Sequence, residues 1–412
     1  MGEPLTADEK IALIKENLQE VLKPEVIEDV IKNQQRPLVV YWGTATTGRP
    51  HCGYFVPMVK IAHFLRAGCK VKILLADIHG FLDNLKAPIE LVKFRAEYYK
   101  FIITALLKSV NVPIDQLEFV LGSSYQLSQK YTMDLFRLSS VVTEHDAKKA
   151  GAEVVKQVDN ATLSGLIYPL MQALDEEHLG VDVQFGGVDQ RKIFTLAAEQ
   201  LSKVGYKERG HLMNPMIPGL AGGKMSSSDP DSKIDVLDEA DVVRRKLKKA
   251  HASPKEVEGN GIISFVEYVL LPVSALKKEG KGEFVVQRRD EEPLVYSDIA
   301  TLKQDYEADR LKPQLLKPAL ADALIELLKP IQDEFQNSEE WKDIEKKAYP
   351  PPPSKKKDKK PRNLGTMFPG AAKVVEAKAD GHIEGISKEQ IDLATNSEEA
   401  MKNLDIKSNG TT

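Results

Sequence analysis

The stretch from Pro37 to Tyr54 constrains the fold of this chain more than any other part of the sequence. It opens with an apolar, β-branched run over residues 38–41, which predicts a buried strand. A turn-rich segment follows, and apolar side chains then recur at helical spacing over residues 55–65. A strand that leads into a helix through a glycine-containing loop points free backbone N–H groups at one place. The sequence therefore predicts an anion site beside His51.

Alternating strands and helices continue beyond this unit. Apolar runs predict further strands at residues 70–76, 117–121, 181–185 and 211–217, with helices at residues 88–110, 164–179 and 193–201 between them. Such alternation is typical of a parallel sheet in an α/β fold, here a Rossmann-like one. Ligands in these folds bind beyond the carboxyl ends of the strands, where Tyr41, His51, Asp77 and His79 fall.

Breaks in the alternation divide the chain into domains. Residues 1–235 form the α/β domain, with short helices over residues 7–33 and a polar, helical insertion at about 123–165. Helical patterns alone follow over residues 236–348, which predicts an all-α domain. Residues 349–412 begin with prolines and lysines and are poor in aromatic side chains, so they are predicted to form a flexible tail.

Composition narrows the classes of partner. The formal net charge of −4 excludes a globally basic nucleic-acid binder and leaves only local basic patches. One such patch is a basic helical face formed by Arg244, Arg245, Lys248 and Lys249. This face is either solvated or a phosphate track, that is, a surface that binds the phosphates of a polyanionic partner. The 2 cysteines provide neither a disulfide framework nor metal-ligand spacing, so a reducing compartment is expected. No apolar run is long enough to cross a membrane.

Two polar patterns lie beside the predicted strands. Within the helix at residues 164–179, Tyr168, Gln172 and Asp175 recur at i, i+4 and i+7, apart from the apolar face. Such residues form either a solvated face or the wall of a polar pocket. The next strand leads into Gly-Gly-Val-Asp-Gln at residues 186–190, where the glycines permit close approach of a ligand and the carboxylate suits ribose hydroxyls.

A third pattern completes a recognisable set. Lys224-Met225-Ser226-Ser227-Ser228 follows a glycine-rich segment and precedes the helical domain. Together with Tyr41, His51-Cys-Gly-Tyr54, the Tyr168 helix and residues 184–192, it resembles the eukaryotic cytosolic tyrosyl-tRNA synthetases, which are class I aminoacyl-tRNA synthetases. The resemblance covers roughly residues 30–348. Tyr54 replaces a histidine and Ser227 a lysine of the family-wide motifs, as the eukaryotic enzymes also do.

The resemblance implies activation of L-tyrosine with ATP to tyrosyl-adenylate, followed by transfer to tRNA(Tyr) in cytoplasmic translation. It makes His51 and Lys224 the catalytic residues, the lysine on a loop that closes over the pyrophosphate. The residues implied for tyrosine are Tyr41 and Asp175 at the phenol, Tyr168, Gln172 and Gln190 at the ammonium group, and His79 in the pocket wall. The residues implied for ATP are Gly43, Gly53, Gly187, Asp189, Met225, Ser226 and Ser228.

The resemblance also implies partners. ATP would act as a substrate with Mg²⁺, without a metal site of the protein's own or a tightly bound cofactor. The insertion would form a homodimer interface, the helical domain would bind the anticodon, and the candidates for the tRNA acceptor end are Lys148, Lys149 and Lys156. A cytoplasmic location is expected. A nuclear pool follows if the basic run at residues 355–362 is an import signal rather than an RNA clamp or a solubilising tail.

Three other functions fit parts of the pattern. A tryptophanyl enzyme of the same fold would have no use for Tyr41 and Asp175 around a phenol. A nucleotidyltransferase of the same superfamily needs neither a helical second domain nor basic tracks for tRNA. A non-catalytic RNA-binding protein derived from a synthetase would carry decayed motifs, whereas these motifs are intact. A P-loop enzyme is excluded because Arg49-Pro50 stands where that motif needs Lys-Ser or Lys-Thr.

Overall fold

A computed structural model of the chain describes residues 5–83, 88–155, 162–220, 222, 232–278 and 280–351. Contacts group residues 1–352 into one unit and residues 353–412 into a second. The second unit, with the basic run predicted at residues 355–362, lies outside the described residues, as does the segment from Lys224 to Ser228.

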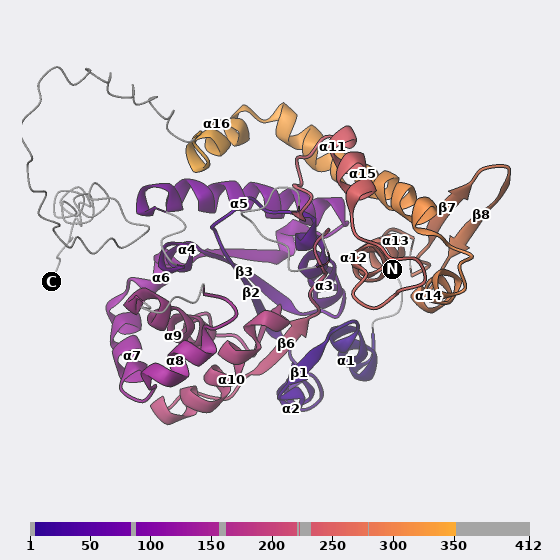
Figure 1. The fold of residues 1–412 in the computed structure, drawn as a ribbon. Helices are drawn as coiled ribbons and strands as arrows, with labels where there is room; N and C mark the ends of the chain where they lie inside the picture. Colours follow the sequence, from indigo (N-terminus) through magenta and orange to yellow (C-terminus); the bar gives the residue numbers. More distant parts are fainter. Residues whose placement is uncertain are drawn as a thin grey trace, which may run out of the picture. The chain divides into compact units, whose positions relative to one another are not determined.

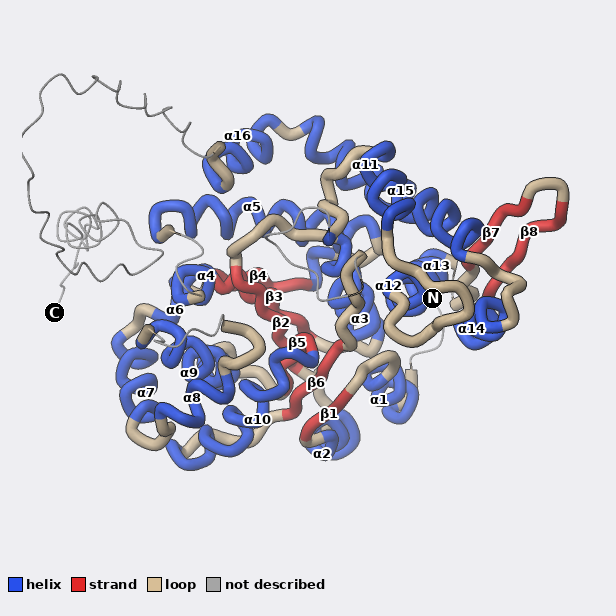
Figure 2. Tube along the Cα trace, viewed as in Figure 1, coloured by secondary structure: helices blue, strands red, loops and turns tan. Residues whose placement is uncertain are grey.

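Within the described residues, a six-stranded sheet forms the centre of the fold (Figures 1 and 2). Its strands are β1 (Glu20–Leu22), β2 (Val39–Ala45), β3 (Lys70–Ala76), β4 (Leu117–Leu121), β5 (Val183–Gly187) and β6 (Gly210–Asn214). Strands β2 to β6 pair in parallel, which confirms the predicted strands with small shifts at their ends. Strand β1 pairs antiparallel with β6, so the prediction of helices alone over residues 7–33 was wrong.

The order of the strands creates a crevice at their carboxyl ends. The order is β1-β6-β5-β2-β3-β4, so the chain builds β3 and β4 on one side of β2 before it crosses to β5 and β6 on the other. Ligands of open α/β sheets bind where the strand order reverses in this way. Here that point lies between the end of β2 at Ala45 and the end of β5 at Gly187.

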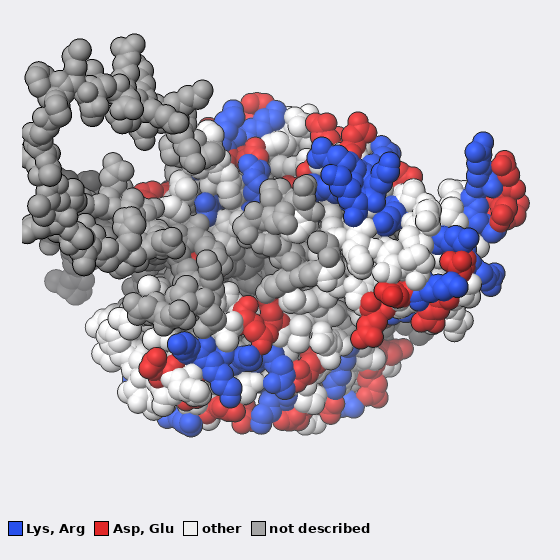
Figure 3. Space-filling model, viewed as in Figure 1, with Lys and Arg blue, Asp and Glu red and all other residues white. Residues whose placement is uncertain are grey.

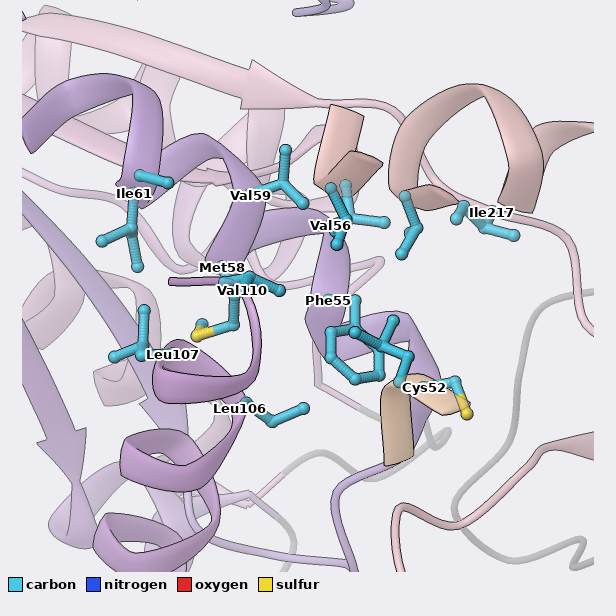
Figure 4. Packing of buried hydrophobic residues seen from close by; sticks show 14 of the residues in the cluster. Cys52, Phe55, Val56, Met58, Val59, Ile61, Leu106, Leu107, Val110 and Ile217 are labelled. Carbon is cyan, nitrogen blue, oxygen red and sulfur yellow. The ribbon is translucent and has the colours of Figure 1, made fainter. Parts of the chain in front are cut away.

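Helices cover both faces of the sheet. The long flanking helices are α3 (Phe55–Arg66), α5 (Ile89–Ser109), α9 (Leu163–His178) and α10 (Arg191–Gln200), and α4 (Asp77–Leu82) follows β3 directly. Successive side chains of a strand point to opposite faces. Val40 and Trp42 therefore join the main hydrophobic cluster with α3 and α5, part of which Figure 4 shows. Tyr41 faces the other way and clusters with Leu179 at the end of α9.

The rest of residues 1–235 adds short helices to this core. Near the N-terminus these are α1 (Ala7–Lys15) and α2 (Pro24–Glu28). The predicted insertion is helical and comprises α6 (Ser123–Gln126), α7 (Gln129–Ser139) and α8 (Glu144–Ala150). Helices α7 and α8 pack on α9. Single helical turns lie at Asp29–Asn33, Cys52–Tyr54, Ile114–Gln116, Val188–Gln190 and Leu201–Val204, and a further turn, Val266–Leu270, lies beyond residue 235 between α12 and α13.

Residues 236–348 are mainly helical, but they are not all-α. The helices are α11 (Ala240–Lys249), α12 (Gly261–Phe265), α13 (Leu271–Lys277), α14 (Ile299–Glu307), α15 (Pro313–Asn337) and α16 (Glu339–Ala348). A hairpin of β7 (Phe284–Arg288) and β8 (Glu291–Tyr296) interrupts them, so the prediction of helices alone was wrong (Figure 2). Phe284 and Val286 are buried while Val285 is exposed, which is the alternation of a half-buried strand.

The last helix of the described residues, α16, packs along α5 (Figure 1). Trp341 of α16 is fully buried and stacks on Phe101 of α5, with ring centroids 5.5 Å apart. The main hydrophobic cluster continues from the sheet through α3 and α5 into α15 and α16. The two predicted domains therefore share one core, and a domain boundary at residue 235 stays a prediction. No helix in the described part of the chain has the length and apolarity needed to span a bilayer.

Candidate functional site

A cavity of about 370 Å³ opens at the carboxyl ends of β2 and β5. Each described residue that the sequence predicts for the site lines it, namely Tyr41, Gly43, His51, Gly53, His79, Tyr168, Gln172, Asp175, Gly187, Asp189 and Gln190. The predicted Lys224, Met225, Ser226 and Ser228 lie outside the described residues. Folding thus gathers side chains from β2, α4, α9 and the turn after β5 around one space.

Asp175 of α9 is fully buried beside this cavity. Its Oδ1 atom accepts three hydrogen bonds, from the Tyr125 hydroxyl at 2.8 Å, the Gln126 amide at 2.9 Å and the Tyr131 hydroxyl at 2.9 Å. Its Oδ2 atom has no hydrogen-bond partner among the described residues. The Nε2 atom of His79 lies 3.9 Å from Oδ2 and is likewise unpaired there. Buried polar atoms are normally paired, so this pair of atoms marks a place for a ligand hydroxyl.

The charge of Asp175 responds to its surroundings. Burial raises the pKa of Asp175 to about 7, and the three donors on Oδ1 oppose this rise. Burial also lowers the pKa of His79 to about 4, so its ring is neutral near pH 7 and cannot form an ion pair with the carboxylate. A ligand hydroxyl that donates to Oδ2 would favour the ionised form of Asp175.

Two amides and two phenols line the space next to Asp175. The Tyr41 hydroxyl donates to the backbone oxygen of Gln172 at 3.3 Å, and the Gln172 side-chain amide donates to Oε1 of Gln190 at 2.8 Å. Tyr168 packs edge-on against His79, with ring centroids 4.7 Å apart. Burial raises the pKa of both Tyr41 and Tyr168, so their hydroxyls stay protonated.

His51 lies where the segment after β2 meets the helical turn that precedes α3. Its Nδ1 atom accepts a hydrogen bond from the backbone N–H of Gly53 at 3.2 Å. Burial, with Lys233 nearby, lowers the pKa of His51 to about 4. The neutral ring therefore carries its proton on Nε2, which makes that atom a donor without a positive charge. Tyr54, the departure from the family motif, hydrogen-bonds Thr44 at 3.0 Å and packs edge-on against His51.

The Asp189 carboxylate lies close to Gly187 at the end of β5. A Cβ atom at Gly187 would lie 2.5 Å from Oδ1 of Asp189, so any larger residue there would force the carboxylate to move. Asp189 and Gln190 lie in the turn Val188–Gln190, at the mouth of the crevice between β2 and β5.

The three donors to Asp175 were not predicted from the sequence. Tyr125, Gln126 and Tyr131 belong to α6 and α7, in the stretch that was assigned to an interface between subunits. Their spacing carries no pattern that sets them apart from other polar residues of that stretch. Asp77, which falls at the predicted edge, instead holds the start of α6, because its Oδ1 accepts from the backbone N–H of Ser123 at 2.8 Å.

Basic side chains gather over α11, where Figure 3 shows a cluster of Lys and Arg. Arg244 pairs with Asp322 at 3.2 Å, and Lys246 is anchored by Asp238 at 2.6 Å. The predicted phosphate track therefore lies on an ordered helix outside the cavity. Of the lysines predicted for the acceptor end, Lys148 and Lys149 lie in the last turn of α8, and Lys156 is outside the described residues.

No cluster of His, Cys, Asp and Glu suited to a metal ion occurs among the described residues. Asp83 and Asp189 are the carboxylates that line the cavity together with Asp175. Magnesium is commonly bound through one or two carboxylates and the phosphates of a nucleotide. The donors present thus fit a magnesium ion that arrives with a nucleotide.

The sequence and the fold match known proteins over most of the chain. Residues 32–329 match the family model of tRNA synthetases class I (W and Y). The chain is 56% identical over 384 residues to the cytoplasmic tyrosine–tRNA ligase of Saccharomyces cerevisiae, an alignment that covers 91% of this chain and 98% of the yeast chain. It is 55% identical to the cytoplasmic tyrosine–tRNA ligase of Danio rerio over 85% of this chain, but it spans only 65% of that longer relative.

A solved structure has the same fold. The tyrosyl-tRNA synthetase of Archaeoglobus fulgidus, crystallised with L-tyrosine, superposes with a TM-score of 0.73 at 35% sequence identity. The superposition covers 80% of this chain and 99% of the archaeal chain.

Proposed function

The chain belongs to the tyrosine–tRNA ligases of the class I tRNA synthetase family. We propose that L-tyrosine and ATP react in its cavity and that the tyrosyl group is then transferred to tRNA(Tyr). The carboxylate of tyrosine attacks the α-phosphorus of ATP, pyrophosphate leaves, and tyrosyl-adenylate forms. The tyrosyl group then passes to the terminal adenosine of the tRNA. The first step needs no strong base, because the attacking carboxylate is already ionised. It needs alignment and stabilisation of charge.

The observation that carries this proposal is the unpaired, buried Oδ2 atom of Asp175. A tyrosine phenol would donate its proton to Oδ2 and would accept from Tyr41 or from Nε2 of His79. The bond from Tyr41 to Gln172 is long, at 3.3 Å, and can be exchanged for one to the phenol. Phenylalanine would leave these buried groups unpaired, at a cost of about 1–3 kcal/mol for each group. Tyrosyl-tRNA synthetases are a standard example of enzymes that discriminate against phenylalanine, which lacks the hydroxyl, so the size of this discrimination is already known for the family.

The amides and the second phenol suit the substrate ammonium group. The hydrogen bond from Gln172 to Gln190 orients the two amides, so that their oxygens can accept further N–H donors. The Tyr168 hydroxyl, protonated because of burial, supplies another acceptor oxygen. Three neutral oxygens around an ammonium group fix the orientation of the amino acid without a counter-charge.

His51 and the loop with Lys224 suit the ATP phosphates. The neutral His51 ring offers Nε2–H to a phosphate oxygen, and Gly43 and Gly53 line the same cavity and would face the nucleotide. Asp189 and Gly187 would hold the ribose. A hydrogen bond from the Leu220 amide to the Ser232 carbonyl, at 3.1 Å, ties together the two ends of the segment with Lys224. As the resemblance implies, Lys224 would close over the pyrophosphate, Met225, Ser226 and Ser228 would contact the nucleotide, and Mg²⁺ would be bound through the phosphates.

An exposed apolar surface suits a second copy of the chain. Leu127, Met133 and Phe136, on α7 and just before it, expose 68%, 56% and 62% of their surface, and Leu163 at the start of α9 exposes 76%. Helices α7 and α9 pack together, and exposed apolar side chains on neighbouring helices can form an interaction surface. We assign it to a homodimer in the cytoplasm, with tRNA(Tyr) bound across the helical residues 236–348 and the basic face of α11.

Amino-acid-dependent exchange of pyrophosphate into ATP tests the function across all twenty amino acids. Exchange should depend on tyrosine alone. Exchange with tryptophan would favour a tryptophanyl enzyme of the same fold. Absence of exchange with both tyrosine and tryptophan would contradict the proposed ligase activity. Transfer of labelled tyrosine to tRNA(Tyr) tests the second step and separates a ligase from a nucleotidyltransferase.

A further inference from the structure

The segment at residues 46–50 connects β2 to His51 without forming a helix or a strand. Side chains from elsewhere satisfy three successive carbonyl groups of this segment. Thr47 O accepts from Arg95 at 2.8 Å, Gly48 O from the hydroxyls of Tyr99 at 2.5 Å and Tyr349 at 2.9 Å, and Arg49 O from Lys233 at 3.3 Å. These side chains supply the hydrogen bonds that a regular element would make within itself.

Tyr349, directly after α16, is the most distant of these partners along the chain. Its ring lies beneath two guanidinium groups, with Arg49 4.8 Å and Arg95 5.1 Å from the centroid. Arg49 also forms an ion pair with Glu345 of α16 at 2.5 Å, and Arg95 donates to the carbonyl of Ala348 at 3.2 Å. The end of the last helix therefore contacts both the backbone and the side chain of the segment before His51.

His51 is held from its other flank as well. The backbone N–H of Cys52 donates to the carbonyl of Ile234 at 2.9 Å, and His51 forms a β-bridge with Asp235. The position of His51 thus depends on two sets of contacts. One set comes from Ile234 and Asp235, and the other comes from the end of α16 through residues 46–50.

We propose that Tyr349 and Glu345 are positioning residues for adenylate formation, which act on His51 through residues 46–50. The proposal rests on the proposed function, in which His51 donates to an ATP phosphate. Neither residue lines the cavity, so neither touches the substrates. Arg49 forms an ion pair with Glu345 and stacks on Tyr349. Its guanidinium group therefore stabilises residues 46–50 and does not bind the ATP phosphates. The final helix of the helical domain would in this way set the geometry of the ATP site.

The expected effect follows from how sharply catalysis depends on position. A displacement of about 1 Å of a catalytic group can lower the rate by about a hundredfold. Tyr349→Phe keeps the ring that both guanidinium groups contact and removes only the hydroxyl that donates to Gly48. Glu345→Gln keeps the shape of the side chain and removes the charge that holds Arg49. Each change should let residues 46–50, and with them His51, shift by a fraction of about 1 Å.

Tyrosine-dependent pyrophosphate exchange of the full chain measures the effect. Tyr349→Phe and Glu345→Gln should each lower kcat about tenfold and raise the KM for ATP, with the KM for tyrosine unchanged within about twofold. Glu340→Gln is the matched control, since Glu340 is an exposed acid on the same helix, and it should behave as wild type. Equal changes in the two KM values, or an unchanged kcat, would overturn the proposal.

A double-mutant cycle with His51 separates positioning from a general loss of structure. If Tyr349 acts through His51, His51→Ala with Tyr349→Phe should be no slower than His51→Ala alone. Additive losses would overturn the proposal, because they would mean that Tyr349 acts elsewhere. Absence of exchange in the wild-type chain would instead contradict the proposed function, so the two failures are distinguishable.

Discussion

At the scale of single residues, Asp175 combines a pKa of about 7 with one unpaired oxygen. A phenol that donates to Oδ2 stabilises the carboxylate, so tyrosine binding should lower the pKa of Asp175 and release a proton. The affinity for tyrosine should therefore rise with pH, by up to about tenfold per pH unit, and level off above about pH 7. Equilibrium binding of tyrosine without ATP, between about pH 5.5 and 8.5, measures this.

The control for this prediction is Asp175→Asn, which cannot titrate. Its affinity for tyrosine should be weak and independent of pH over the same range. A wild-type profile as flat as that of the variant would show that Asp175 does not meet the phenol.

The Tyr131 hydroxyl, one of the three donors to Asp175, should tune the same titration. Tyr131→Phe keeps the ring and removes a bond that stabilises the ionised carboxylate, so the pKa of Asp175 should rise further. The pH at which tyrosine affinity levels off should move upward, and discrimination against phenylalanine should fall several-fold. Binding titrations with both amino acids check this. A variant with reduced affinity but an unmoved profile would indicate a packing role alone.

At the scale of elements, α7 has two roles on two faces. Tyr131 on its buried face contacts Asp175, while Met133 and Phe136 on its other face are exposed. Phe136→Glu places a charge on the proposed dimer surface and should raise the dimer dissociation constant at least about thirtyfold, the equivalent of about 2 kcal/mol. Analytical ultracentrifugation measures this. Val295→Glu changes another exposed apolar side chain, 55% exposed on the β7–β8 hairpin, and should leave the dimer intact. Equal dissociation in both variants would remove α7 from the interface.

At the scale of the whole molecule, the main hydrophobic cluster of the described residues runs from Ile11 to Ala348 and crosses the predicted domain boundary. Trp341 of α16 is fully buried between Phe101 of α5 and Phe335 of α15. Trp341→Ala should lower the free energy of unfolding by about 3–5 kcal/mol. Because the core is shared, the α/β part and the helical part should lose stability together, in one transition. Chemical denaturation followed both by circular dichroism and by a probe on the hairpin checks this, and two separated transitions would contradict it.

Much of this organisation could be predicted from local patterns. Strand and helix periods depend on neighbouring residues, so the strands at residues 70–76 and 117–121 were predicted to the residue. The rule that ligands bind at the carboxyl ends of parallel strands predicts Tyr41, His51 and His79 at the site, and all three line the cavity, whereas Asp77, predicted at the same edge, does not. The site residues of α9 and of the turn after β5 follow from the resemblance to the synthetase family. Short strands were harder: β1 has only 3 residues, and its assignment depends on pairing with β6 at positions 211–213. The β7–β8 hairpin was missed because its alternation is brief and lies within a helical context.

The sequence by itself determined the α/β alternation and the motifs, because periodicity and glycine-rich turns are local properties of the chain, and the resemblance carried by those motifs named the residues that line the cavity. Only the tertiary structure decided which groups satisfy Asp175 and which hold the segment before His51. Tyr131 is 44 positions from Asp175, and Tyr349 is 301 positions from Gly48. A hydrogen bond between such distant residues leaves no periodic trace in the sequence, since only the packing of α7 on α9 and of α16 on α5 brings donor and acceptor together.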